Sequence, residues 1–146
     1  MRGYFGIGIY HTKTKENIGT LWRSAYIFGA SFIFTIGKRY KKQSSDTTKA
    51  WTKIPLFHYD TFDEFQLHRP HDCRLVGIEQ SDYSLDLKTL HHPERCIYLL
   101  GAEDHGLPQD VMIRCQRIVH IDTSICLNVA VAGSIVMYDR NTKGGK

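Results

Sequence analysis

The chain has 146 residues, a hydrophobic content of 42% and a net charge of +4. This length predicts one domain over residues 1–146, and the hydrophobic content excludes a disordered chain. The N-terminus lacks the cleavage site of a secretory signal, and the longest apolar stretch, 26–37, is too short to span a bilayer. The cysteines form no CxxC pair and no disulfide framework: Cys73, Cys96, Cys115 and Cys126. We therefore expect a cytoplasmic protein with no membrane segment.

Positive charge is concentrated in two parts of the chain. One cluster lies in a polar segment, Lys38, Arg39, Lys41, Lys42 and Lys49, and another near the C-terminus, Arg140, Lys143 and Lys146. Such clusters can bind the phosphate backbone of a nucleic acid, or they can be a solvated loop and tail.

The first half of the chain predicts alternating strands and helices. Residues 4–10 are rich in Ile, Tyr and Phe and predict a buried strand. Apolar residues then recur at helical spacing from Ile18 to Phe28, and this helix should end near Gly29. Residues 31–36 and 74–78 predict further strands, separated by a basic loop at 37–49, a short stretch at 56–59 and an amphipathic turn through Phe62 and Phe65. Residues 79–94 predict a loop with a short helix.

The second half continues the alternation. Residues 96–100 and 117–121 predict strands, and a helix should run from Pro108 to about Cys115. The last helix, at 127–140, is apolar on nearly all sides and should be buried on several of them. This order predicts an α/β fold with a mostly parallel sheet.

Three segments can carry chemistry. In the first, residues 17–29, Asn17 is placed to cap the helix, and Arg23 points away from the apolar stripe. In the second, a strand runs into a glycine-bracketed turn at 101–108, where open α/β sheets bind ligands. In the third, residues 125–139, Asn128 is a single polar residue in the first turn of an apolar helix. An ordinary amphipathic helix and a capping amide are the alternative interpretations of the first and third segments.

In this order the three segments resemble the motifs of the SpoU/TrmH family of RNA methyltransferases. The matches are the family's NxGxxxRxAxxFG, its hydrophobic-GxExxGL and its SLNVSVA helix, and they cover residues 6–139. The resemblance implies a trefoil-knotted α/β domain with helices on both faces of the sheet. It also implies a homodimer formed through the first and last helices.

The resemblance implies S-adenosylmethionine as cofactor and a ribose 2′-hydroxyl of tRNA or rRNA as the methyl acceptor. In the family, backbone groups hold the cofactor, and the matching positions here are Gly77, Gly101, Ala102, Gly106, Ile121, Leu127 and Ala130. Arg23 matches the arginine that approaches the target ribose and phosphate. Positioning and electrostatic stabilisation are the roles we expect for it, because Arg is a poor base. The family's other polar positions map to Asn17, Glu103 and Asn128.

Three departures from the family pattern stand near the last motif. Cys126 replaces the usual catalytic Ser, Ala130 replaces the second Ser, and the segment 121–126 is about three residues shorter. The chain also shows no N-terminal RNA-binding extension, so the resemblance predicts that RNA binds the dimer itself.

Rival interpretations remain open. A related knotted enzyme could methylate a base, with Cys126 as a covalent nucleophile. A non-catalytic RNA-binding or assembly protein is another, although the retention of Asn17, Arg23, Glu103 and Asn128 favours catalysis. A zinc site near His68, His71 and Cys73 matches no closed ligand spacing, and we expect no metal.

Overall fold

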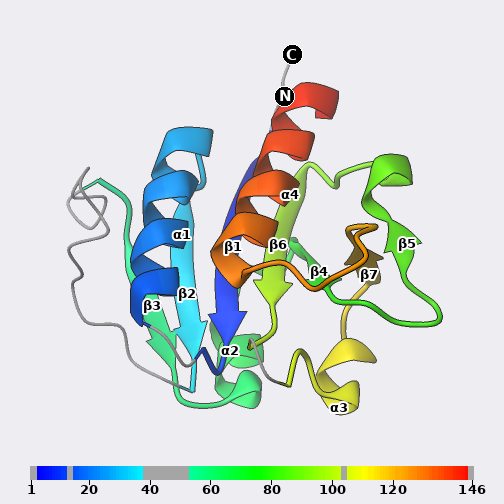
Figure 1. Cartoon of the computed structure of the whole chain (residues 1–146). Helices are drawn as coiled ribbons and strands as arrows, with labels where there is room; N and C mark the ends of the chain where they lie inside the picture. Colours follow the sequence, from blue (N-terminus) through cyan, green and yellow to red (C-terminus); the bar gives the residue numbers. More distant parts are fainter. Residues whose placement is uncertain (1–2, 13–14, 38–52, 103–104, 145–146) are drawn as a thin grey trace.

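A seven-stranded sheet forms the centre of the protein in the computed structural model (Figure 1). The structure describes residues 3–12, 15–37, 53–102 and 105–144, so the basic segment from Lys38 to Lys49 and Glu103 lie outside it. The strand order is β3-β2-β1-β6-β4-β7-β5, and neighbouring strands in that order pair in parallel. The mostly parallel α/β sheet predicted from the sequence is therefore confirmed.

The central strands are β1 (Tyr4–Tyr10), β6 (Arg95–Leu100) and β4 (Arg74–Ile78). They are flanked by β2 (Phe32–Ile36) with β3 (Leu56–Tyr59), and by β7 (Arg117–His120) with the two-residue β5 (Leu85–Asp86). Because all of these strands are parallel, their carboxyl ends meet at one edge of the sheet.

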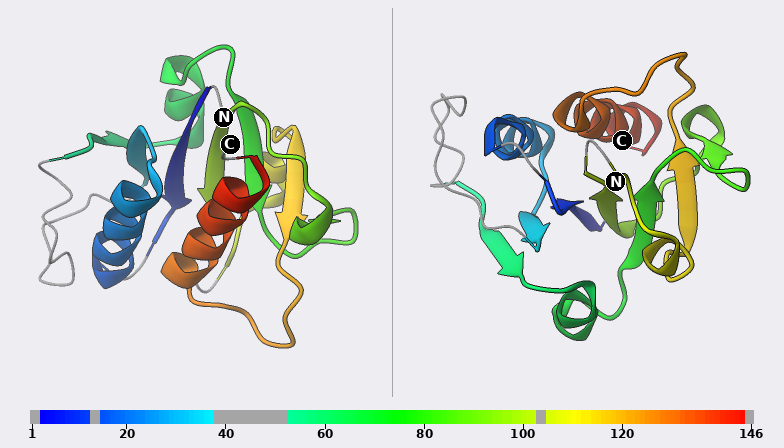
Figure 2. Two further views of the ribbon diagram at one scale, coloured as in Figure 1. Left: turned by 90° about the horizontal axis from the view of Figure 1, so that it is seen from above. Right: turned by 60° about the horizontal axis from the view of Figure 1, so that its bottom comes forward.

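Helices cover both faces of the sheet, as predicted (Figure 2). Helices α1 (Lys15–Phe28) and α4 (Val129–Gly144) pack side by side on one face. Helices α2 (Phe62–His68) and α3 (Gln109–Met112) pack on the other. A hydrophobic core lies on each face of the sheet, and strand β6 contributes to both. Tyr98 lies in the core under α1 and α4, and Ile97 lies in the core under α2 and α3. Strands buried on both faces need continuous apolar runs, which the sequence of β6 supplies.

Several predicted boundaries differ from the structure. The helix expected from Pro108 to Cys115 is the single turn of α3, followed by turns, because its apolar residues serve only a short contact with the sheet. The loop at 79–94 contains β5 and a 3-10 turn at Leu87–Thr89, and the stretch at 56–59 is an edge strand. Helix α1 begins at Lys15, so Asn17 lies within its first turn and is not its N-cap residue. Helix α4 exposes one apolar stripe to solvent: Val131, Ile135 and Tyr138.

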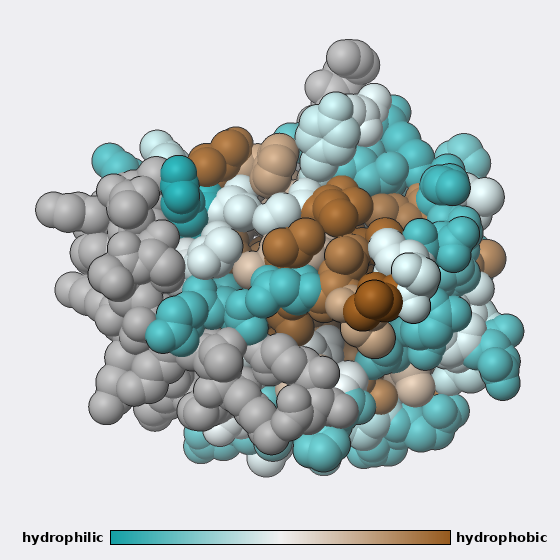
Figure 3. All heavy atoms as spheres, in the orientation of Figure 1, coloured by the Kyte–Doolittle hydropathy of each residue, from teal (hydrophilic) through white to brown (hydrophobic). Residues whose placement is uncertain are grey.

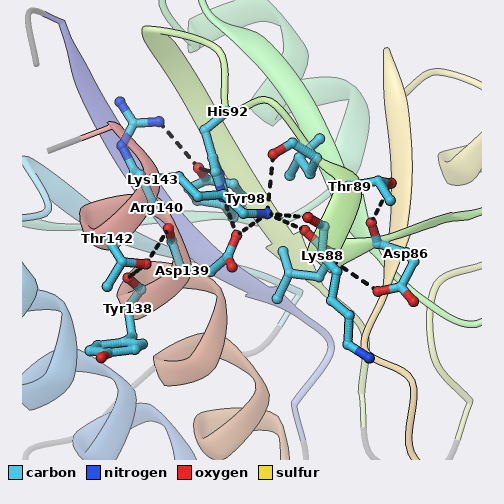
Figure 4. A network of polar contacts seen from close by, with 12 residues as sticks. Asp86, Lys88, Thr89, His92, Tyr98, Tyr138, Asp139, Arg140, Thr142 and Lys143 are labelled. Atoms are coloured by element: carbon cyan, nitrogen blue, oxygen red, sulfur yellow. Dashed lines mark hydrogen bonds and ion pairs between the residues drawn. The ribbon is translucent and has the colours of Figure 1, made fainter.

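A buried polar network fixes the C-terminal half of α4 (Figure 4). His92 lies between two partners, with Nδ1 2.6 Å from the Tyr98 hydroxyl and Nε2 2.7 Å from Asp139 Oδ2. Arg140 donates to the same Tyr98 hydroxyl at 3.1 Å, and Lys143 forms an ion pair with Asp139 at 2.9 Å. Every donor has an acceptor when His92 is neutral, with its proton on Nε2 and the Tyr98 hydroxyl donating to Nδ1. Burial lowers the pKa of His92, although hydrogen bonding to Asp139 opposes that shift.

The lowered pKa predicts that acid destabilises the fold through His92. Because the unfolded chain takes up the proton more readily, the free energy of unfolding should fall as the pH drops through about 6.5, the ordinary histidine pKa. Denaturant titrations from about pH 7.5 to about pH 5.5 should show a shallower fall for His92→Gln, which cannot titrate. His91→Gln, at the exposed neighbouring residue, should retain the wild-type slope. An unchanged slope in His92→Gln would contradict this role.

Candidate functional site

A cavity of about 720 Å³ opens at the carboxyl ends of β4, β6 and β7. The turn after β6 forms one wall, the segment after β7 forms the facing wall, and residues just after β4 lie between them. Twelve apolar or small residues and seven polar or charged ones line it: Ile78, Glu79, Gln80, Leu100, Gly101, Ala102, His105, Gly106, Leu107, Met112, His120, Ile121, Asp122, Thr123, Ser124, Cys126, Leu127, Val129 and Ala132. Ligands of open α/β sheets bind at this edge.

Two glycines allow the turn after β6 to fold back on itself. A Cβ at Gly101 would collide with the backbone of Gly106 and Leu107. Gly106 has a φ of 62°, and its N–H donates to the Ala102 carbonyl at 2.9 Å. The turn can therefore bring backbone groups close to a ligand, which side chains at these positions would prevent.

Glu79 connects the turn to the neighbouring strand. Its N–H donates to the Val119 carbonyl at 2.9 Å, which extends the β4–β7 pairing by one residue. Its Oε2 accepts the Leu107 N–H at 2.7 Å, and its Oε1 accepts the Gln80 N–H at 2.9 Å. The half-buried carboxylate is thus held in one position between β4 and the turn.

The facing wall follows β7 and is more exposed. The Thr123 hydroxyl donates to the Ile125 carbonyl at 2.8 Å, and Cys126 is an exposed free thiol. At the end of β7, His120 Nδ1 lies 2.8 Å from the Ser84 hydroxyl. This link ties the residues around β5 to the pocket edge.

Asn17 and Asn128, which the sequence places far apart, meet where α1 and α4 begin. The Asn128 Nδ2 donates to the Asn17 Oδ1 at 2.8 Å. Asn128 Oδ1 also accepts the N–H groups of Ala130 and Val131, at 2.9 and 3.2 Å, and so caps α4. The capping interpretation is therefore correct for Asn128, and the same amide links the two helices beside the pocket.

Arg23 lies on the exposed side of α1, away from the apolar packing stripe, as predicted. It shares that side with Thr20 and Ile27, which are also exposed. It is not among the described residues that line the pocket. Within the described part of this chain, the arginine and the pocket are therefore separate features.

The predicted cofactor-binding residues fall into two groups in the structure. Five line the pocket together with Cys126: Gly101, Ala102, Gly106, Ile121 and Leu127. Gly77 and Ala130 are buried just behind the lining, where a Cβ on Gly77 would contact Ile118, Leu107 and Cys115. Glu103, predicted as a supporting polar residue, lies outside the described residues. Sequence reasoning missed Glu79, Gln80 and His120, although an acidic residue directly after a buried strand was a usable signal.

The described residues offer neither a metal site nor a membrane span. Within the described ranges, no three His, Cys, Asp or Glu residues gather in a way that could hold a metal ion. Among those same residues, no helix has both the length and the apolar character needed to cross a bilayer.

Comparisons with known proteins relate this architecture to RNA-modifying enzymes. A mouse protein, tRNA (guanosine(18)-2′-O)-methyltransferase TARBP1, is 25% identical over 134 residues, which takes in 84% of this chain and 8% of that protein. The chain thus corresponds to a small part of that relative.

Solved structures share the fold at lower identity. An AdoMet-bound rRNA methyltransferase from Sinorhizobium meliloti superposes with a TM-score of 0.84 at 22% identity, covering 97% of this chain and 57% of that one. A structure described as giving insights into 2-OH methylation of C/U34 on tRNA has a TM-score of 0.83 at 21% identity and covers 99% of both chains. The TrmH/SpoU tRNA modifying enzyme of A. aeolicus has a TM-score of 0.84 at 17% identity, covering 98% of this chain and 78% of that one.

The family model spans nearly the whole sheet, all of α1 and the first ten residues of α4. It matches residues 5–138, and so includes the turn after β6, the Asn17–Asn128 pair and Arg23. The chain belongs to the SpoU rRNA Methylase family.

Proposed function

We propose that the protein transfers a methyl group from S-adenosylmethionine to a ribose 2′-hydroxyl of RNA, in tRNA or rRNA. The observation that most directly supports this function is the pocket at the turn between Gly101 and Gly106, in a chain that belongs to an RNA methylase family. The Asn17–Asn128 hydrogen bond beside this pocket holds the starts of α1 and α4 together and so fixes the pocket wall.

The pocket fits the adenosine part of this cofactor. Leu100, Leu107, Ile121 and Leu127 supply apolar surface for a flat base. The glycines of the tight turn allow a ligand to lie close to its backbone. The volume of about 720 Å³ is in the range of ligand pockets in proteins.

Bound S-adenosylmethionine supplies a sulfonium methyl group that is already activated for transfer. The protein has to bring the 2′-hydroxyl into line with that carbon and to stabilise the oxygen as its proton leaves. Arg23 has a planar set of N–H donors suited to a phosphate or a developing alkoxide. Asn128 holds the start of α4 against α1, which fixes the pocket wall relative to the helix that carries Arg23.

A two-fold dimer through α1 and α4 would unite Arg23 with a pocket. Apolar side chains gather over α4 on the face shown in Figure 3. Helix α1 exposes the adjacent Tyr26 and Ile27, and α4 exposes a stripe at helical spacing: Val131, Ile135 and Tyr138. Because such exposed apolar residues are unfavourable in water, we propose that they pack against a second copy of the chain. The Arg23 of one protomer would then act at the pocket of the other.

Cofactor binding is the first test. S-adenosylmethionine or S-adenosylhomocysteine at millimolar concentration should raise the thermal midpoint, since a ligand of the native state stabilises it. Gly101→Val should abolish the shift, because the added side chain displaces the Gly106 backbone. Thr89→Val, at an exposed residue outside the pocket lining, is the control and should retain it. No shift of the wild-type protein with either ligand would refute the proposal.

Replacement of Arg23 separates catalysis from folding. Because its side chain is exposed, Arg23→Ala should leave stability and cofactor affinity nearly unchanged. Transfer of labelled methyl to RNA should fall roughly 10²-fold or more, as for loss of a preorganised electrostatic group. Arg23→Lys should restore little activity, because a point charge cannot make two parallel hydrogen bonds. Arg74→Ala, at an exposed arginine on the opposite edge of the sheet, is the control.

A mixing experiment with the same variant tests the dimer. When Arg23→Ala and Gly101→Val chains are co-refolded, mixed dimers contain one complete site, and activity should return to about a quarter of wild type. A mixture as inactive as its components would show that Arg23 does not act across an interface. A monomeric mass in light scattering would contradict the dimer directly.

Substitutions of Cys126 test the role of the thiol that stands where the family usually has a serine hydroxyl. A thiol is a weak hydrogen-bond donor and acceptor, so Cys126→Ser should keep or raise the transfer rate, and Cys126→Ala should lower it only modestly. Severe loss in both variants, together with a trapped protein–RNA adduct, would instead indicate a covalent nucleophile and methylation of a base. Cofactor affinity should be measured in parallel to exclude a binding defect.

A further inference from the structure

Glu79 has a fixed carboxylate in the lining of the pocket and takes no part in the methyl transfer proposed above. It follows β4, which pairs directly with β6, so its side chain lies beside the turn that leaves β6. Oε2 accepts the Leu107 N–H at 2.7 Å and packs against Gly106, while Oε1 accepts the Gln80 N–H at 2.9 Å. These two bonds hold both carboxylate oxygens in place before any ligand binds.

The carboxylate still has acceptor capacity. A carboxylate has roughly four lone-pair positions, and the two backbone bonds use one on each oxygen. A ligand in the pocket therefore meets two adjacent acceptors of fixed spacing. The group complementary to such a pair is a pair of adjacent donors.

We propose that Glu79 binds the ribose 2′- and 3′-hydroxyls of the adenosine cofactor and so helps to select a ribonucleoside ligand. This inference rests on the proposed S-adenosylmethionine-dependent function. The two hydroxyls are vicinal donors that match the two oxygens of the carboxylate. The adenine edge fits less well, because its ring nitrogens are acceptors that a carboxylate would repel.

The position in the sheet supports the same assignment. Dinucleotide-binding α/β folds place a glycine-rich turn after one strand, and an acidic residue further along the chain accepts a hydrogen bond from the ribose 2′-hydroxyl. Here the glycine turn follows β6, and the acidic residue directly follows the adjacent β4. The two strands occur in the opposite chain order, but they bring the same pair of groups to one edge of the sheet.

The test is a set of affinities measured by calorimetry for wild type and Glu79→Gln. The ligands are S-adenosylhomocysteine, its 2′-deoxy and 3′-deoxy analogues, and 5′-methylthioadenosine, which lacks the amino-acid part. For the wild type, removal of either hydroxyl should weaken binding roughly 10- to 100-fold, as for hydrogen bonds to a charged group. In Glu79→Gln the parent ligands should bind more weakly, and removal of a hydroxyl should cost much less.

The outcomes separate three explanations. Equal weakening of parent and deoxy ligands by Glu79→Gln would overturn the proposal, because it would mean that Glu79 only braces the turn. Weakening confined to S-adenosylhomocysteine and absent for 5′-methylthioadenosine would overturn it too, because the partner would then be the ammonium group. Failure of wild type to bind S-adenosylhomocysteine at all would refute the proposed function itself. Asp82→Asn, at an exposed carboxylate outside the pocket lining, is the control and should keep the wild-type sensitivity to hydroxyl removal.

Discussion

The close approach of Gly101 to the backbone of Gly106 determines the shape of the pocket. Any side chain at residue 101 would separate the two backbone segments, and the positive φ of Gly106 returns the chain to Glu79. The Glu79 carboxylate then fixes the turn by accepting the Leu107 N–H. One wall of the pocket therefore combines a close backbone turn and a half-buried carboxylate with the apolar side chains of Leu100 and Leu107.

The parallel sheet brings motifs that are separate in the sequence together at one site. Strands β4, β6 and β7 end at the same edge, so residues 79, 101–102, 105–107 and 121–127 meet there although they are far apart in sequence. The Asn17–Asn128 hydrogen bond adds the starts of α1 and α4 to this edge. The His92 network secures the other end of α4, so that the helix is held at both ends.

Much of this arrangement could be predicted from the sequence. The apolar runs of β1, β4 and β6 and the helical spacing in α1 are local signals, and they indicated the sheet class and the helix that exposes Arg23. Edge strands such as β5 carry no comparable signal, because two residues cannot show a period. The extent of α3 and the pocket position of Glu79 depend on tertiary contacts, with the core in one case and with the Leu107 N–H in the other. The trefoil knot implied by the family resemblance concerns chain threading and stays a prediction.

The pairing of β1 with β6 also has a consequence for how the chain reaches its native state. Tyr4 pairs with Arg95, so β1 is synthesised about 90 residues before the strand that pairs with it on that side. The apolar side chains of β1 that face α4 stay uncovered longer still, until α4 has been synthesised. Non-local pairing of this kind makes folding slow, and until folding is complete it leaves apolar surface exposed to aggregation. The nascent protein should therefore depend on chaperones more than a helical protein of the same length.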